Sequence, residues 1–366
     1  MITHTGGHIR VMVVDDSAVV RGVLGRTVDA QDDMRVVTTA TNGRDALAAL
    51  RQQEIDVVLL DVEMPVMDGL TALPLICQQY PRVRVLITSS LTGQSASVTL
   101  RALSLGAVDY VYKPSARGGG VGGVEAAAAS IIAKIRAVAQ PSSRNDSAVR
   151  RAQLRDGSVP RVMRSTQPTG DFDPQVLALA ASTGGPNALS AVIRGLPGDF
   201  PLPVLVTQHM PPIFTTMFAQ RLERDSNLPC SEARDGEQLR AGRVYVAPGD
   251  HHMIVENGAV GRGPVVRITS DPPEHHCRPA ADPMLRSLAR VFPNAVLAVV
   301  LTGMGDDGRE GCAAVSASGG RIVVQDEGTS VVWGMPGSVV ASGIPCSVLP
   351  LQSISAHVAS LCYARS

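Results

Sequence analysis

The feature that most constrains the fold of this 366-residue chain is an alternation of short apolar runs with longer amphipathic stretches. Between residues 9 and 113, five apolar runs of strand length are separated by stretches with apolar residues at helical spacing, such as "GRDALAALRQQ". A second alternating block starts near Asp173 and contains the runs "QVLALAA", "LPVLVTQH", "GRVYVAP", "AVLAVVLTG", "RIVVQD" and "CSVLPL". This alternation predicts, in each block, a parallel sheet with helices on both faces.

The two blocks predict two α/β domains, at residues 9–138 and 173–366, joined by a linker at 139–172. The linker is polar, has no strong period, and carries more basic than acidic residues. A solvated linker is the plainer interpretation, and a docking surface is the alternative. Within the second block, "HHMIVENGAVGRG" predicts a β-hairpin with its turn at Asn257-Gly258.

Composition narrows the class of protein. Apolar residues make up 45% of the chain and the formal net charge is zero, so packed cores are expected and no bulk charge draws the chain to nucleic acid or acidic lipid. The N-terminus lacks the pattern of a signal peptide, and no apolar run approaches the ~20 residues of a membrane span. The six cysteines form no CxxC pair, as expected for reduced thiols in the cytoplasm.

Polar residues at the strand ends of the first block predict a phosphoryl site. Asp15 and Asp16 follow the first run, and Asp61 ends the third. Because ligands bind beyond the carboxyl ends of parallel strands, these acids should converge, and three carboxylates need a cation such as Mg²⁺ between them. Ser89 and Lys113 end the fourth and fifth runs. A hydroxyl and an ammonium beside acids and Mg²⁺ suit one phosphoryl group.

The second block also places polar residues after three apolar runs. Ser182 follows "QVLALAA", His209 ends "LPVLVTQH", and Asp307 lies in "GMGDDG" after "AVLAVVLTG". If the three strands are parallel, a nucleophile, a base and an orienting carboxylate meet at one edge of the sheet. The plainer interpretation is that Ser182 caps a helix begun by Pro186, that the histidine is packed, and that "GMGDDG" is a turn.

Other interpretations of the second block are weaker. The Gly184-Gly185 turn could cradle a phosphate, but the dinucleotide pattern G-x-G-x-x-G is absent. The clusters His251-His252 and His275-His276-Cys277 suggest zinc but lack a regularly spaced fourth ligand. Acidic residues outnumber basic ones from residue 173 onward and no basic helix-turn-helix is evident, which disfavours DNA binding.

The spaced set DD…D…S…K-P resembles the response-regulator receiver domain over residues 9–138. The resemblance implies a flavodoxin-like fold in which Asp61 is the phosphoacceptor. It also implies that Asp16, Asp61 and the backbone carbonyl of Glu63 hold Mg²⁺, with Asp15 nearby.

The same resemblance assigns the remaining polar residues of the crevice. Ser89 and Lys113 would contact the phosphoryl group, and Tyr110 matches the aromatic switch position. Phosphorylation would add about −1.5 to −2 charges at this crevice and could bias a two-state face of the domain.

Five motifs of the second block, "AASTGGP", "TQHMPPIFT", "VYVAPGDHHM", "LTGMGDDG" and "QDEGTSVVWGMPGSV", resemble the catalytic domain of chemotaxis protein-glutamate methylesterases, the CheB family. The stretches "SSLTG" and "LRALSLGAVDYVYKP" resemble that family's own receiver. The resemblance implies a doubly wound, mostly parallel α/β methylesterase domain.

The family resemblance implies a role for each residue of the second site. Ser182 would be the nucleophile on γ-methyl esters of receptor glutamates, His209 its general base, and Asp307 the carboxylate that orients His209. Backbone N–H groups near Thr183 and Met304 would bind the oxyanion. The same acyl chemistry would deamidate specific receptor glutamines, and it needs no cofactor.

The implied partners are methyl-accepting chemotaxis receptors as substrate and a histidine kinase as phosphodonor. Nucleic acid is not expected as a partner, and the chain is expected to contact membranes only through the receptors. It is expected to be a monomer. We hypothesise that the unphosphorylated receiver packs over the esterase crevice and that phosphorylation of Asp61 loosens it. The alternatives are a non-catalytic regulator that binds receptor or kinase, and a receiver-gated esterase acting on another substrate.

Overall fold

The structure is a computed structural model that describes residues 8–90, 93–113, 123–139, 163–164 and 172–363. The chain divides into two compact units, residues 1–141 and 142–366, and each is described by itself. Most of the predicted linker lies outside the described residues. None of the described helices is both long and apolar enough to span a membrane.

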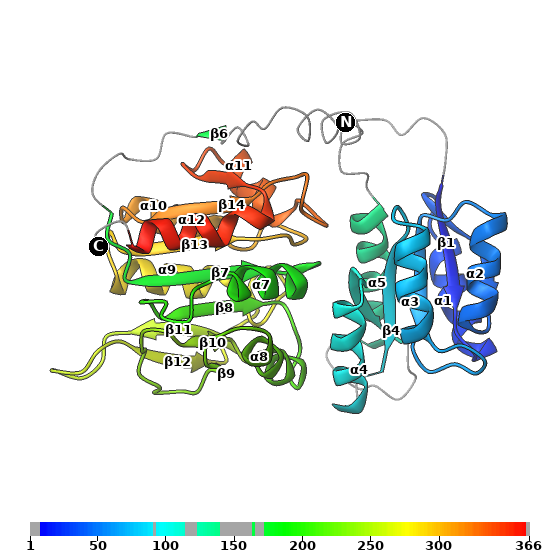
Figure 1. The fold of residues 1–366 in the computed structure, drawn as a ribbon, viewed down its shortest axis with the longest axis horizontal. Helices are drawn as coiled ribbons and strands as arrows, with labels where there is room; N and C mark the ends of the chain where they lie inside the picture. Colours follow the sequence, from blue (N-terminus) through cyan, green and yellow to red (C-terminus); the bar gives the residue numbers. More distant parts are fainter. Residues whose placement is uncertain (1–7, 91–92, 114–122, 140–162, 165–171, 364–366) are drawn as a thin grey trace. The chain divides into compact units, whose positions relative to one another are not determined.

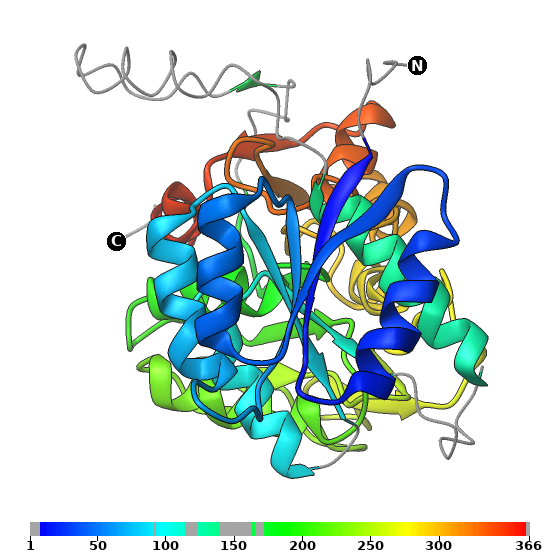
Figure 2. The same ribbon diagram turned by 90° about the vertical axis from the view of Figure 1, so that its right-hand side faces the viewer.

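The N-terminal unit is a five-stranded parallel sheet with the order β2-β1-β3-β4-β5. Helices α1 and α5 cover one face of the sheet, and α2, α3 and α4 cover the other (Figure 2). The strands are β1 (Ile9–Val14), β2 (Met34–Ala40), β3 (Val57–Asp61), β4 (Arg84–Ser89) and β5 (Asp109–Tyr112). The helices are α1 (Ala18–Asp29), α2 (Gly43–Gln52), α3 (Gly69–Gln79), α4 (Gly93–Ser104) and α5 (Gly123–Ala139).

Local sequence explains where these elements begin. Strand β3 is buried along its whole length, as expected for a central strand of a parallel sheet covered on both faces. Ser17, Asn42 and Asp68 cap α1, α2 and α3, each accepting a hydrogen bond from a backbone N–H of the first turn. The cap of α1 starts that helix three residues after β1, so the loop that carries Asp15 is short, whereas Asp61 is the last residue of β3.

The C-terminal unit is built on an eight-stranded sheet with the order β6-β15-β14-β13-β7-β8-β10-β9 (Figure 1). Its strands are β6 (Met163–Arg164), β7 (Val176–Ala181), β8 (Val204–Gln208), β9 (Cys230–Glu232), β10 (Val244–Val246), β13 (Val296–Val300), β14 (Arg321–Gln325) and β15 (Ser347–Leu349). Its helices are α7 (Gly185–Arg194), α8 (Phe214–Asp225), α9 (Ala281–Val291), α10 (Arg309–Ala317), α11 (Met335–Ala341) and α12 (Leu351–Tyr363). Among the described strands of this sheet, β6 alone pairs antiparallel, and it falls within the range predicted as linker.

The order of strands reverses at the centre of this sheet. From β7 the chain proceeds through β8 in one direction, and it later returns to β13 on the other side of β7 and continues outward through β14. Strands β13, β7 and β8 are mutually parallel neighbours. Such a switch point leaves a crevice at the carboxyl ends of the strands, where ligands bind in doubly wound folds. The predicted α/β fold of both units is confirmed.

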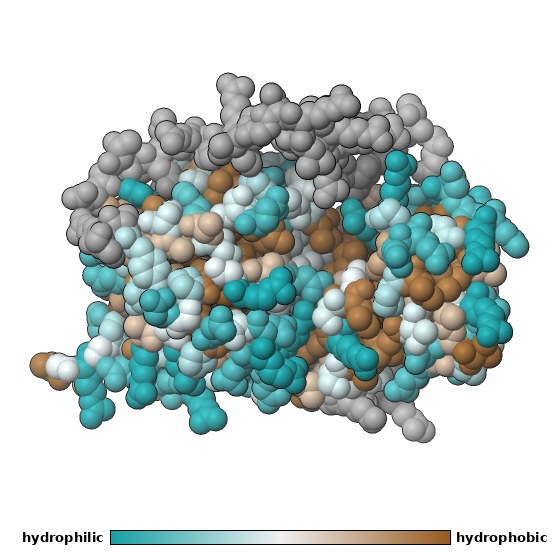
Figure 3. Space-filling model, in the orientation of Figure 1, coloured by the Kyte–Doolittle hydropathy of each residue, from teal (hydrophilic) through white to brown (hydrophobic). Residues whose placement is uncertain are grey.

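The hairpin is present, but its predicted turn is wrong. Strands β11 (His252–Glu256) and β12 (Val265–Thr269) pair antiparallel, and Glu256 is opposite Val265, so the loop spans 257–264. Neither Asn257 nor Gly258 has the positive φ that a two-residue turn requires. Gly258 instead packs closely on the backbone of Gly263. The loop projects from the unit and ends in a hydrophobic tip, consistent with the full exposure of Val260 (Figures 1 and 3).

Candidate active site

The predicted phosphoryl site is assembled around Lys113. Its Nζ lies 2.8 Å from Asp15 Oδ2 and 2.7 Å from Asp61 Oδ2, and both carboxylates are buried. Burial raises the pKa of Asp61 above its usual range, against the opposing effect of the Lys113 ammonium. The pKa of Lys113 is raised, because the two carboxylates outweigh the cost of burying its charge. A single ammonium thus balances two buried acids.

The donor set at this crevice fits Mg²⁺. One carboxylate oxygen from each of Asp15, Asp16 and Asp61 lies within 4.8 Å of the others, and hard oxygen ligands are those that Mg²⁺ prefers. Asp16 is exposed and, with Glu63, lines an adjoining pocket of about 380 Å³.

The two expected switch residues lie inside the N-terminal unit. The hydroxyl of Ser89 hydrogen-bonds Thr99 Oγ1 of α4 at 2.8 Å and donates to the carbonyl of Ser90 at 3.2 Å. Tyr110 is 5% exposed, and the Lys134 ammonium of α5 lies 4.7 Å from the centre of its ring. In this state Ser89 is held by α4, and the tyrosine ring faces inward.

In the C-terminal unit, Ser182 follows β7 in a turn that does not use its side chain as a cap. The N-cap of α7 is Gly184, with φ 77° and no side-chain capping bond. A Cβ on Gly184 would lie 2.7 Å from Val331 Cγ2, and one on Gly185 would lie 2.1 Å from Gln208 Oε1. The Ser182 hydroxyl makes no hydrogen bond to any residue within the described part of the chain. The helix-cap interpretation of Ser182 is therefore wrong.

His209 and Asp307 are brought together as the sequence predicts. His209 Nε2 lies 2.7 Å from Asp307 Oδ2, and the carboxylate is fully buried. Burial by itself lowers the pKa of His209, but the hydrogen bond to Asp307 and the nearby Cys277 thiol outweigh it and raise the pKa. Burial raises the pKa of Asp307, but the His209 contact and two backbone N–H groups prevail and lower it. The pair thus favours a charged carboxylate beside the ring.

Asp307, and not its neighbour Asp306, faces the histidine. The N-terminus of α9 holds Asp307: the Ala281 N–H donates to Oδ2 at 2.6 Å and the Asp282 N–H donates to Oδ1 at 3.0 Å. A helix N-terminus stabilises negative charge. Asp306 instead pairs with Arg309 at 3.0 Å. The support from α9 had no signal in the sequence, because it depends on where a helix distant in the chain begins.

The backbone N–H groups predicted to bind the oxyanion are not used in the hydrogen bonds of the described residues. Neither the Thr183 N–H nor the Met304 N–H donates a hydrogen bond within the described residues. The neighbouring backbone is fixed by Thr302, whose hydroxyl donates to the Thr183 carbonyl at 2.9 Å, and by Gln208, whose amide donates to the Ser182 carbonyl at 3.0 Å. Both are buried polar residues at strand ends, a signal that sequence reasoning passed over.

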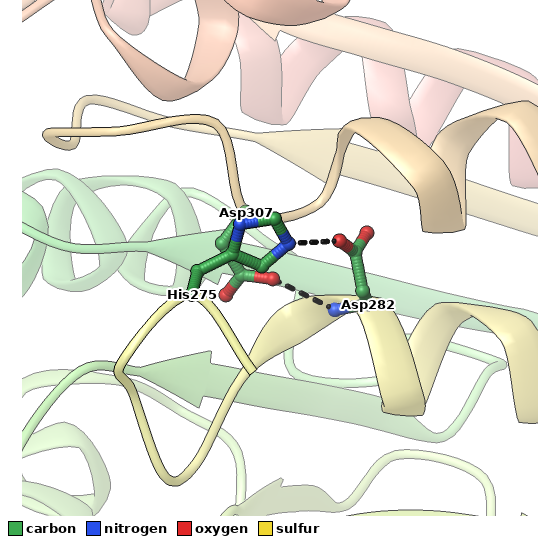
Figure 4. Close-up of side chains that lie close together, drawn as sticks. All are labelled: His275, Asp282 and Asp307. Carbon is green, nitrogen blue, oxygen red and sulfur yellow. Dashed lines mark hydrogen bonds and ion pairs between the residues drawn. The ribbon is translucent and has the colours of Figure 1, made fainter. Parts of the chain in front are cut away.

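The histidine clusters do not form the zinc sites considered from sequence. The ring nitrogens of His251 and His252 lie near backbone carbonyls, those of Gly249 and Pro272. His275 lies against Asp282 and Asp306. His275, Asp282 and Asp307 could in principle surround a metal ion, but their oxygens and nitrogen already have protein partners (Figure 4).

Each of the two units matches a known protein family. Residues 177–358 match the CheB methylesterase family and residues 11–119 match the response regulator receiver domain. The chain is 45% identical to protein-glutamate methylesterase/protein-glutamine glutaminase 1 of Paramagnetospirillum magneticum, covering 98% of this chain and 97% of that protein. It is 46% identical to protein-glutamate methylesterase/protein-glutamine glutaminase 2 of Caulobacter vibrioides, covering 96% and 98%.

A solved structure agrees with the C-terminal unit. The catalytic domain of the Thermotoga maritima CheB methylesterase is 38% identical, with a TM-score of 0.50, and the match covers 52% of this chain and 99% of that one. The motifs, the fold and these relatives agree over nearly the whole length of the sequence. The chain therefore belongs to the CheB family of protein-glutamate methylesterases/protein-glutamine glutaminases, with a receiver domain before the catalytic domain.

Proposed function

We propose that Ser182, His209 and Asp307 form the catalytic triad with which this chain hydrolyses glutamate γ-methyl esters, and deamidates specific glutamines, on chemotaxis receptors. The observation that carries the proposal is the 2.7 Å contact between His209 Nε2 and Asp307 Oδ2, at the end of the strand next to the one that Ser182 follows. A buried histidine oriented by a carboxylate beside an unbonded serine is the arrangement of nucleophilic acyl transfer.

The ring nitrogens of His209 have separate tasks. In the neutral ring Nε2 donates to Asp307, and Nδ1 can accept the proton of Ser182 Oγ as the hydroxyl attacks the γ-carbonyl carbon. Because the pKa of His209 is raised, this neutral form gains population as the pH rises. The protonated ring then gives that proton to the departing methanol, leaving a glutamyl ester on Ser182. Water attacks this ester by the same route and releases the glutamate carboxylate and free Ser182. Ammonia replaces methanol as the leaving group in deamidation.

The unpaired N–H groups of Thr183 and Met304 would bind the oxyanion of the tetrahedral intermediate. Each such donor contributes about 10²–10³-fold to the rate in comparable sites. Gly184 permits this turn, since its positive φ and its contact with Val331 leave no room for a side chain.

The receiver would regulate the esterase through Asp61. Asp61 would accept a phosphoryl group from a chemotaxis histidine kinase. Asp16, Asp61 and the Glu63 carbonyl, with Asp15 nearby, would hold Mg²⁺, which neutralises charge on the phosphoryl oxygens. Lys113 would offset charge on the same group, Ser89 would leave Thr99 to contact it, and Tyr110 would follow as the switch. We propose that this rearrangement of the receiver on phosphorylation raises the activity of the esterase domain.

The test is methanol release from methylated receptor membranes by the full chain. Ser182→Ala should reduce the rate at least ~10³-fold. The matched control is Ser190→Ala in α7, which removes a buried hydroxyl without a hydrogen-bond partner and should leave the rate unchanged. A Ser182→Ala variant that turns over at the wild-type rate would defeat the triad and favour a non-catalytic regulator.

A further inference from the structure

The turn before α9 presents His275 to the carboxylates beside Asp307. Glu274 and Cys277 exchange backbone hydrogen bonds of 3.2 and 2.8 Å, and the two central residues, His275 and His276, have φ 51° and 60°. Side chains other than glycine seldom adopt this left-handed conformation, and it persists where the surroundings enforce it. Figure 4 shows the His275 ring beside Asp307 and directed toward Asp282, whereas His276 is exposed.

Both ring nitrogens of His275 face carboxylate oxygens. Nε2 lies 2.8 Å from Asp282 Oδ2, and Nδ1 lies 3.1 Å from Asp306 Oδ1. The Nε2 contact is a hydrogen bond, and the Nδ1 contact is at ion-pair distance. Burial raises the pKa of Asp282, whereas the Gly311 N–H and His275 favour its ionised form. Because an ionised carboxylate only accepts hydrogen bonds, the ring that faces both carboxylates in their ionised forms is an imidazolium. Burial by itself lowers the pKa of His275, but the bond to Asp282 and the charges of Asp307 and Asp306 outweigh it and raise the pKa.

These two carboxylates flank the proposed triad acid on separate elements. Asp282 opens α9, and its backbone N–H donates to Asp307 Oδ1 at 3.0 Å. The Asp282 side chain also accepts from the Gly311 N–H of α10 at 2.6 Å. Asp306 is the residue immediately before Asp307 in the chain. One imidazolium therefore links the helix that holds the Asp307 carboxylate to the loop that carries it.

The other charged groups around His275 are already paired. Arg309 of α10 pairs with Asp306 at 3.0 Å, and Arg286 of α9 pairs with Glu274 at 2.5 Å. Cys312 of α10 is fully buried near Asp282 and Asp307, and burial raises the pKa of its thiol so that it stays neutral. His275 is thus the cation that bridges these two carboxylates.

We propose that His275, as an imidazolium bridging Asp282 and Asp306, is a positioning residue that fixes Asp307 in the triad. This inference rests on the proposed function and deepens it, since His275 acts through Asp307 and is assigned no contact with substrate. As the pH rises through the raised pKa of His275, the ring loses a proton and one of its two carboxylate contacts. The link between α9 and the loop that carries Asp307 is then weaker, although the Ala281 and Asp282 N–H groups still bind the Asp307 carboxylate.

The experiment compares kcat and KM for methanol release in the wild type, His275→Gln and His276→Gln over a range of pH. At pH 6.5, the ordinary pKa of histidine, His275→Gln should lower kcat about tenfold and leave KM unchanged, because misplaced catalytic groups slow the chemical step. The ratio of wild-type to His275→Gln kcat should fall toward one as the pH rises. His276→Gln, on the same turn, should match the wild type throughout.

A second variant and a second readout keep the inference testable if His275→Gln folds poorly. Asp306→Asn removes one partner of the ring, so a pH-dependent loss of kcat should begin at lower pH than in the wild type. The low-field NMR proton of the His209–Asp307 hydrogen bond should shift in His275→Gln and remain in place in His276→Gln.

Turnover and the NMR signal separate the two proposals. If the wild type releases no methanol but the NMR proton of the His209–Asp307 hydrogen bond shifts in His275→Gln, the proposed function is defeated and the role of His275 is not. Normal turnover together with a kcat ratio that does not vary with pH, or an effect on KM alone, would overturn the role of His275.

Discussion

The two domains place polar residues at the same point of similar sheets, yet they balance charge differently. In the receiver, two buried carboxylates share one lysine, and a third carboxylate lies within reach. In the catalytic domain, the Asp307 carboxylate that contacts His209 also accepts hydrogen bonds from two backbone N–H groups of α9. The first crevice retains oxygen ligands for a cation and a phosphoryl group. In the second, the Asp307 carboxylate already has three nitrogen partners, which suits the role proposed for it, that of orienting a base.

The sharpest way to break this comparison is to remove the charge that orients His209. Asp307→Asn should lower the rate of methanol release by about 10⁴-fold, because an amide no longer favours the ring tautomer that leaves a nitrogen free for Ser182. Asp306→Asn is the matched control, since Asp306 does not contact His209, and its effect at low pH should be far smaller. Equal losses of rate in Asp307→Asn and Asp306→Asn would contradict the assignment of Asp307, and not Asp306, to the triad.

The corresponding change in the receiver should affect regulation and not chemistry. Asp61→Asn should abolish stimulation of methanol release by a phosphodonor and leave the basal rate unchanged, because Asp61 is the proposed phosphoacceptor. Asp68→Asn is a suitable control in the adjoining pocket, since asparagine also caps a helix and α3 keeps its start. Normal stimulation of the Asp61→Asn variant would contradict the coupling of the two domains.

Chelation should separate the two sites by their ligands. Removing Mg²⁺ with EDTA should prevent phosphorylation of the receiver by a small-molecule phosphodonor, because the receiver's carboxylates then lack a cation. Mass spectrometry of the intact chain measures the phosphorylation. The basal rate of methanol release should be unaffected, since the oxygens of Asp307 are bound by N–H groups. Loss of basal turnover on chelation would place a metal ion in the esterase site.

Glycine substitutions should change stability in opposite directions in the two domains. Gly184→Ala should lower the free energy of unfolding of the catalytic domain by about 1–3 kcal/mol, since φ is 77° and Val331 fills the space. Gly25→Ala in α1, where a Cβ meets nothing within 4 Å, should stabilise the receiver by up to about 1 kcal/mol. Denaturant unfolding measures the free energy of unfolding of each variant. An unchanged free energy of unfolding in Gly184→Ala would contradict a constrained turn at Gly184.

The sequence predicted both crevices because their residues follow buried strands, and strand ends of parallel sheets meet. It predicted Ser182, His209 and Asp307 at neighbouring strand ends, and the structure places the last two in contact. It did not predict the support that α9 gives Asp307, or the bridge made by His275, because both depend on the packing of segments far apart in the chain. The loop of 257–264 was missed because Asn257-Gly258 is a turn signal only when its backbone adopts positive φ.

Trapping the acyl intermediate would show whether Ser182 is the nucleophile. The full chain would be mixed with a methylated receptor fragment, quenched with acid during turnover, and digested for mass spectrometry. If Ser182 is the nucleophile, the peptide that contains it will carry a glutamyl ester, and the same peptide from Ser182→Ala will not. Steady release of methanol with no adduct on Ser182, and the same rate from Ser182→Ala, would contradict this role of Ser182.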